Sequence, residues 1–164
     1  MRKTLMILLM SFVLLLVEML NANRHINLSL VNAMTTGLFR AAHDASLQVD
    51  PSQQNDGFIV FDREKAHAVF VDTFARNLRL KANLEPQNGS WLKDPVEILH
   101  EEYIDDSSGV SFPYNYRNDQ FKIYRTLNGP AAIFEVRIKS PRSSAYSYNG
   151  YIYKNIIQEY PLLN

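Results

Sequence analysis

The first fifty residues constrain this chain more than any other feature. Met1 to Asp50 contain no proline and one glycine, and an apolar block from Leu5 to Leu20 runs without a break into a helix-patterned stretch that ends at Val49. Proline and glycine are the residues that most disfavour a helix interior, so their near absence predicts one long helix. Such a helix would have one end in a membrane and the other packed on a globular domain.

The apolar block is preceded by two basic residues, Arg2 and Lys3. Basic residues before an apolar segment hold the N-terminus in the cytoplasm, so the rest of the chain is expected outside. A spanning helix needs about 20 apolar residues and a signal peptide only about 7 to 15, and this block falls between. Ala22, with Leu20 two positions upstream, is a poor match to a signal cleavage site. Residues 1–22 are therefore interpreted as a membrane anchor. The alternative is that they form a signal segment, whose cleavage would leave a secreted protein.

One carboxylate interrupts the apolar block near its outer end. A charge such as Glu18 costs about 2.5 to 3.5 kcal/mol at the centre of a membrane helix, and less near an end. Glu18 can reach the lipid headgroups from its position. The alternative is that it pairs with a cationic partner inside an assembly.

Residues 23–50 are predicted to continue as an amphipathic helix. Apolar and small residues recur there at three- and four-residue steps, the spacing of one helix face. These residues are Leu30, Met34, Leu38, Ala41, Ala42 and Ala45. Asp50-Pro51 should end the helix, because the residue before a proline is disfavoured in helical conformation. A polar loop is expected from Pro51 to Gly57.

This layout resembles that of the type IV pilin-like proteins, including the minor pilins of Tad-type secretion systems. The resemblance implies an apolar helix that continues into an amphipathic half packed on a small β-rich domain, and a subunit that associates with similar subunits in a cell-envelope machine. Prepilins usually have a glycine just before the apolar block and a glutamate near its beginning. Here Thr4 precedes the block and Glu18 lies near its end, so neither peptidase processing nor any site residue is carried over.

Residues 51–164 have the size of one small extracytoplasmic domain. Phe58 to Phe61 is predicted to be a short strand, and Asp62 can cap a helix over Arg63 to Leu80. The apolar face of that helix comprises Ala66, Phe70, Phe74 and Leu78. Lys81 to Lys93 would connect it to the sheet.

Three later segments are predicted to form an antiparallel sheet: Val96 to Ile104, Ala131 to Ile138 and Gly150 to Tyr160. Phe121 to Leu127 is a fourth candidate strand, and Asp105 to Asn118 is expected to be a long loop. The predicted fold class is α+β: a long N-terminal helix packed on a small antiparallel sheet with one further helix.

Composition and motifs argue against an enzyme, a nucleic-acid binder and a disulfide framework. The chain has 17 basic and 17 acidic residues and no cysteine. Ser90 to Lys93 fits S-x-x-K and Ser147 to Asn149 fits S-x-N, but no K-T-G follows them. The histidines are spread over different predicted elements, and no H-E-x-x-H is present. They are His25, His43, His67 and His100. We therefore expect no catalytic residue, metal site or cofactor. The expected partner is the membrane.

Two features of the predicted loop keep binding alternatives open. Asp105 and Asp106 are followed by two serines and a glycine, a combination typical of a solvated turn, with calcium binding as the alternative. Tyr114 and Tyr116 flank Asn115 in the same loop, where tyrosines favour contact with a partner. They support a second function: a secreted or anchored module that recognises cell-wall polysaccharide or peptide.

Overall fold

The structure is a computed structural model that describes residues 2–90, 92–141 and 149–161. Its elements, in chain order, are α1 (Arg2–Ser46), α2 (Pro51–Asn55), α3 (Arg63–Leu78), β1 (Glu97–Ile104), the 3₁₀ helix η1 (Asp106–Ser108), β2 (Tyr114–Asn118), β3 (Ile123–Leu127), β4 (Ala131–Lys139) and β5 (Tyr151–Glu159). The α+β class and the uninterrupted N-terminal helix are confirmed.

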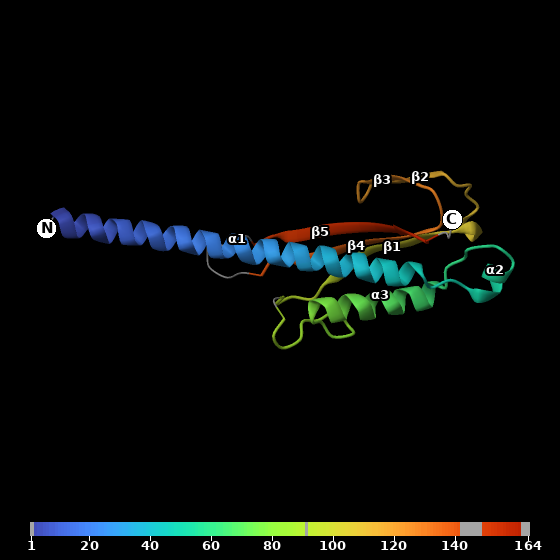
Figure 1. The fold of residues 1–164 in the computed structure, drawn as a ribbon, viewed down its shortest axis with the longest axis horizontal. Helices are drawn as coiled ribbons and strands as arrows, with labels where there is room; N and C mark the ends of the chain where they lie inside the picture. Colours follow the sequence, from blue (N-terminus) through green and yellow to red (C-terminus); the bar gives the residue numbers. More distant parts are fainter. Residues whose placement is uncertain (1, 91, 142–148, 162–164) are drawn as a thin grey trace.

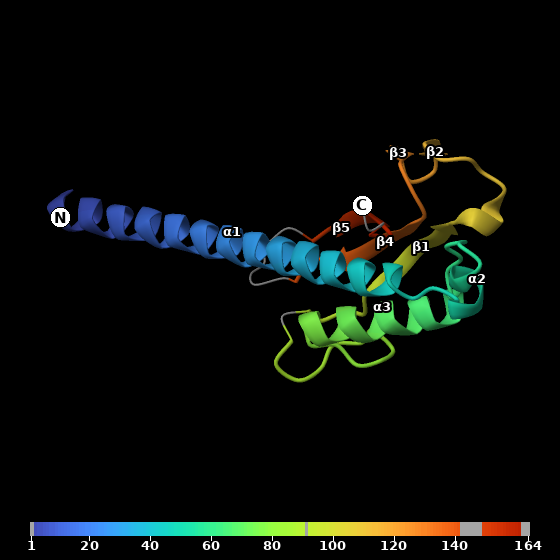
Figure 2. The same ribbon diagram turned by 45° about the vertical axis from the view of Figure 1, so that its right-hand side comes forward.

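The elements form three layers (Figure 1). Helices α1 and α3 pack on one face of a sheet with the antiparallel order β1-β4-β5, and the β2–β3 hairpin covers part of the other face. Figure 2 shows the N-terminal half of α1 projecting beyond the domain, while the hairpin lies at the opposite end of the molecule. The domain therefore packs against only the second half of the long helix.

The amphipathic half of α1 supplies a large part of the core. The six residues of the predicted stripe are each at most 2% exposed. Gly37 lies between them, and a Cβ at this position would be only 3.2 Å from the Cβ of Asn77 on α3. Small residues thus allow the two helices to approach closely, and the predicted packing face is confirmed.

Helix α1 ends at Ser46, so the predicted end at Val49 is wrong. The chain from Gln48 instead pairs with the segment that precedes α3: Asp50 N–H donates to Val60 O at 2.8 Å, and Val49 forms an isolated antiparallel bridge with Phe61. That bridge replaces the strand predicted for Phe58 to Phe61. A further helical turn would have removed these backbone partners.

The predicted polar loop from Pro51 to Gly57 is also wrong, because Pro51–Asn55 forms the short helix α2. Asp50 caps it, and its carboxylate accepts from Ser52 N–H at 2.8 Å. Proline at the first helical position has a suitable φ angle and needs no hydrogen-bond acceptor there. The same Asp-Pro pair that disfavours a helix before it therefore starts one after it.

Helix α3 begins where the sequence predicted. Asp62 accepts from Lys65 N–H at 3.0 Å. The helix ends at Leu78 and not at the predicted Leu80, because Arg79 takes a left-handed conformation. Phe70 and Phe74 are fully buried, and the Phe70 ring stacks on Phe134 of β4 with centroids 3.8 Å apart. This contact fixes α3 against the middle of the sheet.

Strand β4 is buried on both faces. Ala132, Phe134, Val136 and Ile138 join the core beneath the helices, whereas Ala131 and Ile133 join a second apolar cluster beneath the hairpin. The three strands predicted for the antiparallel sheet are confirmed, with β4 as the centre.

The predicted loop from Asp105 to Asn118 is wrong, because it contains η1 and strand β2. Strand β3, the predicted fourth strand, pairs with β2 and does not join the main sheet. Tyr114 and Tyr116 alternate as strand residues do, but Pro113 interrupts the pattern beside them. The hairpin is held by its apolar face, since Tyr116, Ile123 and Leu127 pack towards Ile133.

Candidate functional site

The exposed half of α1 is the first functional feature. Large apolar side chains from Leu5 to Leu20 are exposed on every side of the helix. Among the described residues, α1 is the one helix long and apolar enough to cross a membrane, and the window that qualifies is not buried by the domain. A signal sequence shares this length and composition. The coarse prediction of an N-terminal apolar helix is confirmed.

Glu18 lies exposed on this part of α1, and no described residue forms an ion pair with it. The other predicted assembly residues, Leu30, Met34, Leu38, Ala41 and Ala45, are buried inside the chain's own core. Contacts with another subunit would therefore have to use a different face of α1.

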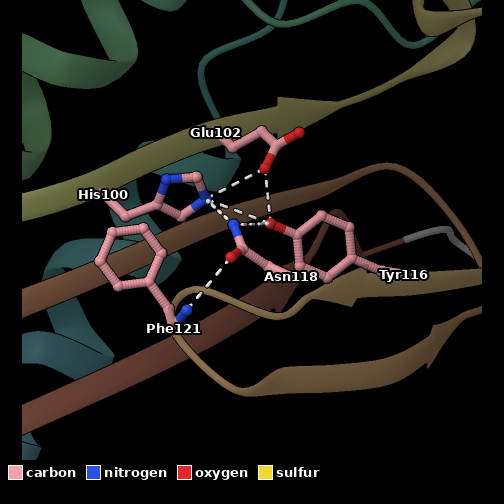
Figure 3. Close-up of polar contacts among 5 residues, drawn as sticks. All are labelled: His100, Glu102, Tyr116, Asn118 and Phe121. Atoms are coloured by element: carbon pink, nitrogen blue, oxygen red, sulfur yellow. Dashed lines mark hydrogen bonds and ion pairs between the residues drawn. The ribbon is translucent and has the colours of Figure 1, made fainter.

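The second feature is a polar cluster between the main sheet and the hairpin, made of His100, Glu102, Tyr116 and Asn118. His100 and Glu102 come from one face of β1, and Tyr116 and Asn118 reach them from β2 (Figure 3). The Tyr116 hydroxyl donates to Glu102 at 2.5 Å, and His100 Nε2 lies 3.0 Å from Glu102 and 3.1 Å from that hydroxyl. Residues that share one face of a strand are two positions apart, which explains both pairs.

The environment of Tyr116 keeps its phenol protonated. The residue is 5% exposed. Burial, and then the hydrogen bond to Glu102, raise the pKa of Tyr116 to about 12. Phe121 closes the other side by stacking on the His100 ring, with centroids 4.8 Å apart. The polar cluster therefore joins the hairpin to the sheet through charged and polar groups as well as apolar contact.

A second carboxylate lies beside His100. Glu135 of β4 is the cross-strand neighbour of His100 and is 6% exposed. Burial raises the pKa of the Glu135 carboxyl, while His100 and a hydrogen bond from Asn155 oppose the rise. Glu135 Oε2 has no hydrogen-bond partner within the described part of the chain. His100 thus lies between two glutamates.

The described residues do not place a metal site in the polar cluster. No group of three histidine, aspartate or glutamate side chains arranged to hold a metal ion occurs in residues 2–90, 92–141 and 149–161. Ser90, the serine of the S-x-x-K motif, is buried in the connection after α3. Its Oγ donates to Leu78 O at 3.3 Å and accepts from Leu92 N–H at 3.2 Å. Residues 147 and 148 of the S-x-N motif lie outside the described ranges.

The third feature is an open groove along β1, which we call the β1-edge groove. It is lined by Arg63, Glu101, Glu102, Tyr103, Ile104, Ser108, Val110 and Tyr114. Glu101 accepts from the Tyr103 hydroxyl at 2.7 Å and lies 2.7 Å from Nδ1 of His67 on α3. Burial and the neighbouring Glu101 raise the pKa of Tyr103 above the usual range for tyrosine. Glu102 belongs both to the groove and to the polar cluster.

The two predicted recognition residues lie on the same face of β2 but meet different surroundings. Tyr114 is half-buried and lines the β1-edge groove, whereas Tyr116 is directed into the polar cluster. No local pattern predicts that cluster, because it forms only where β1 and β2 come together. The alternation of Tyr114 and Tyr116 was the one local indication of a strand.

Asp105 has a structural position. It is fully buried, and its carboxylate accepts from Ser107 N–H at 3.0 Å, Ser107 Oγ at 2.6 Å and Phe61 N–H at 3.1 Å. Asp106 accepts from Ile59 N–H at 2.6 Å. Asp105 therefore caps η1, and both aspartates tie it to the segment before α3. Because Asp105 is fully buried, the turn is not solvated throughout, contrary to the prediction from the sequence.

Comparison with protein-family models, curated proteins and solved structures finds no match for this chain. The resemblance to pilin-like proteins stays a prediction.

Proposed function

We propose that this protein is a membrane-anchored, extracytoplasmic, non-enzymatic subunit of a cell-envelope assembly. The observation that supports this proposal is the change of environment along one continuous helix. Side chains of α1 are exposed all round from Leu5 to Leu20, and from Leu30 onwards one stripe is buried by the domain. An apolar surface of that size is expected to be covered by lipid or by other apolar helices.

The length of the exposed segment suits a bilayer. Thr4 to Ala22 rises about 28 Å at 1.5 Å per residue, close to the roughly 30 Å of the hydrocarbon layer. Glu18 then lies near the outer headgroups, and Arg24 follows beyond them. The first core residue, Leu30, is far enough along the helix for the domain to lie outside the membrane.

Retention of the N-terminus tests the anchor. Intact mass spectrometry of the native protein should show residues 1–22 present, and the protein should leave the membrane fraction with detergent and not with alkaline carbonate. A soluble product that begins near Asn23 would reject the anchor in favour of a cleaved signal segment.

Orientation can be tested in the cysteine-free native background. We expect Arg2 and Lys3 to hold the N-terminus in the cytoplasm. A Gln53→Cys variant, at an exposed position of α2, should react with a membrane-impermeant maleimide in intact cells. Labelling that requires cell lysis would place the domain on the cytoplasmic side.

Assembly with other subunits would use the outward face of α1. Leu28 and Phe39 are 51% and 53% exposed there. Leu28→Cys and Phe39→Cys variants should crosslink between chains in membranes, whereas buried Ala41→Cys should not. Equal absence of crosslinks at all three positions would argue against association through α1.

A second candidate is a module that recognises cell-wall polysaccharide or peptide. The specific observation in its favour is that Tyr114 lines the open β1-edge groove. Retention on cell-wall glycan should weaken for Tyr114→Ala if the ligand is polysaccharide, with Tyr124→Ala, an exposed tyrosine on β3, as the control. Unchanged retention would remove the polysaccharide alternative.

A further inference from the structure

The β1-edge groove follows the edge of the sheet. Four consecutive residues line it, and neighbouring side chains of a strand point to opposite faces. Tyr103 packs in the core beneath the helices, whereas Ile104 packs beneath the hairpin. Because residues from both faces of β1 line the groove, we infer that the edge of the strand forms its floor. Arg63 of α3 then lies on one side and Tyr114 of β2 on the other.

The backbone of β1 is paired on one side only. Within the described strands its neighbour is β4, and β1 ends the sheet order. In an antiparallel edge strand every second residue directs its N–H and C=O away from its neighbour. These groups face the groove and form the template on which an extended peptide can add a strand.

The other edge of the sheet is protected. Lys154 of β5 is the partner of Val136, whose side chain lies in the core beneath the helices. A lysine directed inwards from an edge strand hinders further strand pairing. The two edges therefore differ, and β1 is the one with a groove beside it.

The charges in the groove favour a basic partner. Arg63 is the one lysine or arginine that lines the groove beside Glu101 and Glu102, and each glutamate also contacts a histidine, His67 or His100. We propose that the β1-edge groove binds an extended peptide segment of a partner protein as an added strand, with a lysine or arginine opposite these glutamates. This inference specifies the recognition candidate given above and is independent of membrane anchoring, since no residue of the exposed half of α1 lines the groove.

Selection from a phage-displayed library of random octapeptides, on the full-length protein in detergent micelles, provides the probe. We expect enriched peptides with alternating apolar residues and at least one lysine or arginine. A chosen peptide is then synthesised with backbone N-methyl groups on its odd or on its even residues. One series should lose binding and the other keep it, because only alternate amides of an added strand face β1.

Two further measurements locate the site. Alternate amides of Glu97–Ile104 should become protected from hydrogen exchange when the peptide binds, while those of Tyr151–Glu159 remain unchanged. Arg63→Ala should tighten binding of the basic peptide about twofold to fivefold, the range for one exposed charge pair, and Arg125→Ala on β3 should not.

The proposal is overturned if the library gives no enrichment, if both N-methyl series bind equally, or if protection appears away from β1. Protection of β1 in the absence of peptide, together with a dimer in solution, would assign the groove to a second copy of this chain instead. None of these outcomes depends on the extraction or labelling results for the anchor.

Discussion

At the scale of single residues, Asp105 is the polar side chain on which most local structure depends. It is fully buried and accepts hydrogen bonds from η1 and from Phe61. Asp105→Ala would leave these donors without an acceptor, and we expect a loss of about 3 kcal/mol in the free energy of unfolding. Asp106→Ala, at an exposed position, should cost about 1 kcal/mol. Urea-induced unfolding of both variants measures the difference.

The hydrogen bonds of the Asp105 carboxylate also determine whether calcium can bind at this turn. Because the oxygens of Asp105 already accept from backbone and hydroxyl donors, a cation would have to displace them. We expect calcium at about 5 mM, above the Kd of weak extracellular sites, to leave the unfolding midpoint unchanged. A calcium-dependent increase that disappears in Asp106→Ala would show that the turn is a cation site after all.

Tyr116 gives the fold a specific alkaline sensitivity. Tyr116→Phe removes the hydrogen bond to Glu102 and should cost about 1 to 2 kcal/mol at neutral pH. The folded-state pKa of about 12 exceeds the ordinary value of 10, so this stabilisation is complete below pH 10 and is lost as pH rises through 12. Thermal unfolding at several pH values should show the gap between wild type and Tyr116→Phe narrowing above pH 10. A constant gap would contradict the assignment.

At the scale of elements, the contact between α1 and α3 depends on Gly37. A Cβ there would already be 3.2 Å from the Cβ of Asn77, so a larger side chain must push the helices apart. We expect Gly37→Leu to lower the free energy of unfolding by about 2 to 3 kcal/mol. Thr36→Leu, at the adjacent exposed position, should change it by less than about 0.5 kcal/mol. Similar effects at both positions would indicate that close approach of the helices is not required.

At the scale of the whole molecule, the domain should not need the exposed half of α1. On the N-terminal side, the Ser140 hydroxyl donates a hydrogen bond to Asn27 at 3.0 Å, and the buried stripe begins at Leu30. Residues 23–164 should therefore fold without detergent, with the unfolding midpoint of the full chain. Circular dichroism and thermal unfolding would check this, and an aggregated or unfolded fragment would contradict it.

The sequence by itself determined the features that depend on neighbouring residues. The long helix follows from the near absence of proline and glycine, its packing face from three- and four-residue spacing, and the start of α3 from Asp62 beside an apolar stripe. The strands β1, β4 and β5 were likewise visible as apolar runs. In each case the controlling interactions lie within a few positions along the chain.

Only the tertiary structure decided which distant segments meet. The bridge between Val49 and Phe61 ended α1 early, and the pairing of β2 with β3 converted a predicted loop into a hairpin. The polar cluster joins Glu102 to Tyr116, and the β1-edge groove joins α3 to β2. These contacts depend on strand pairing and layer packing between segments far apart in sequence, so no local pattern could specify them.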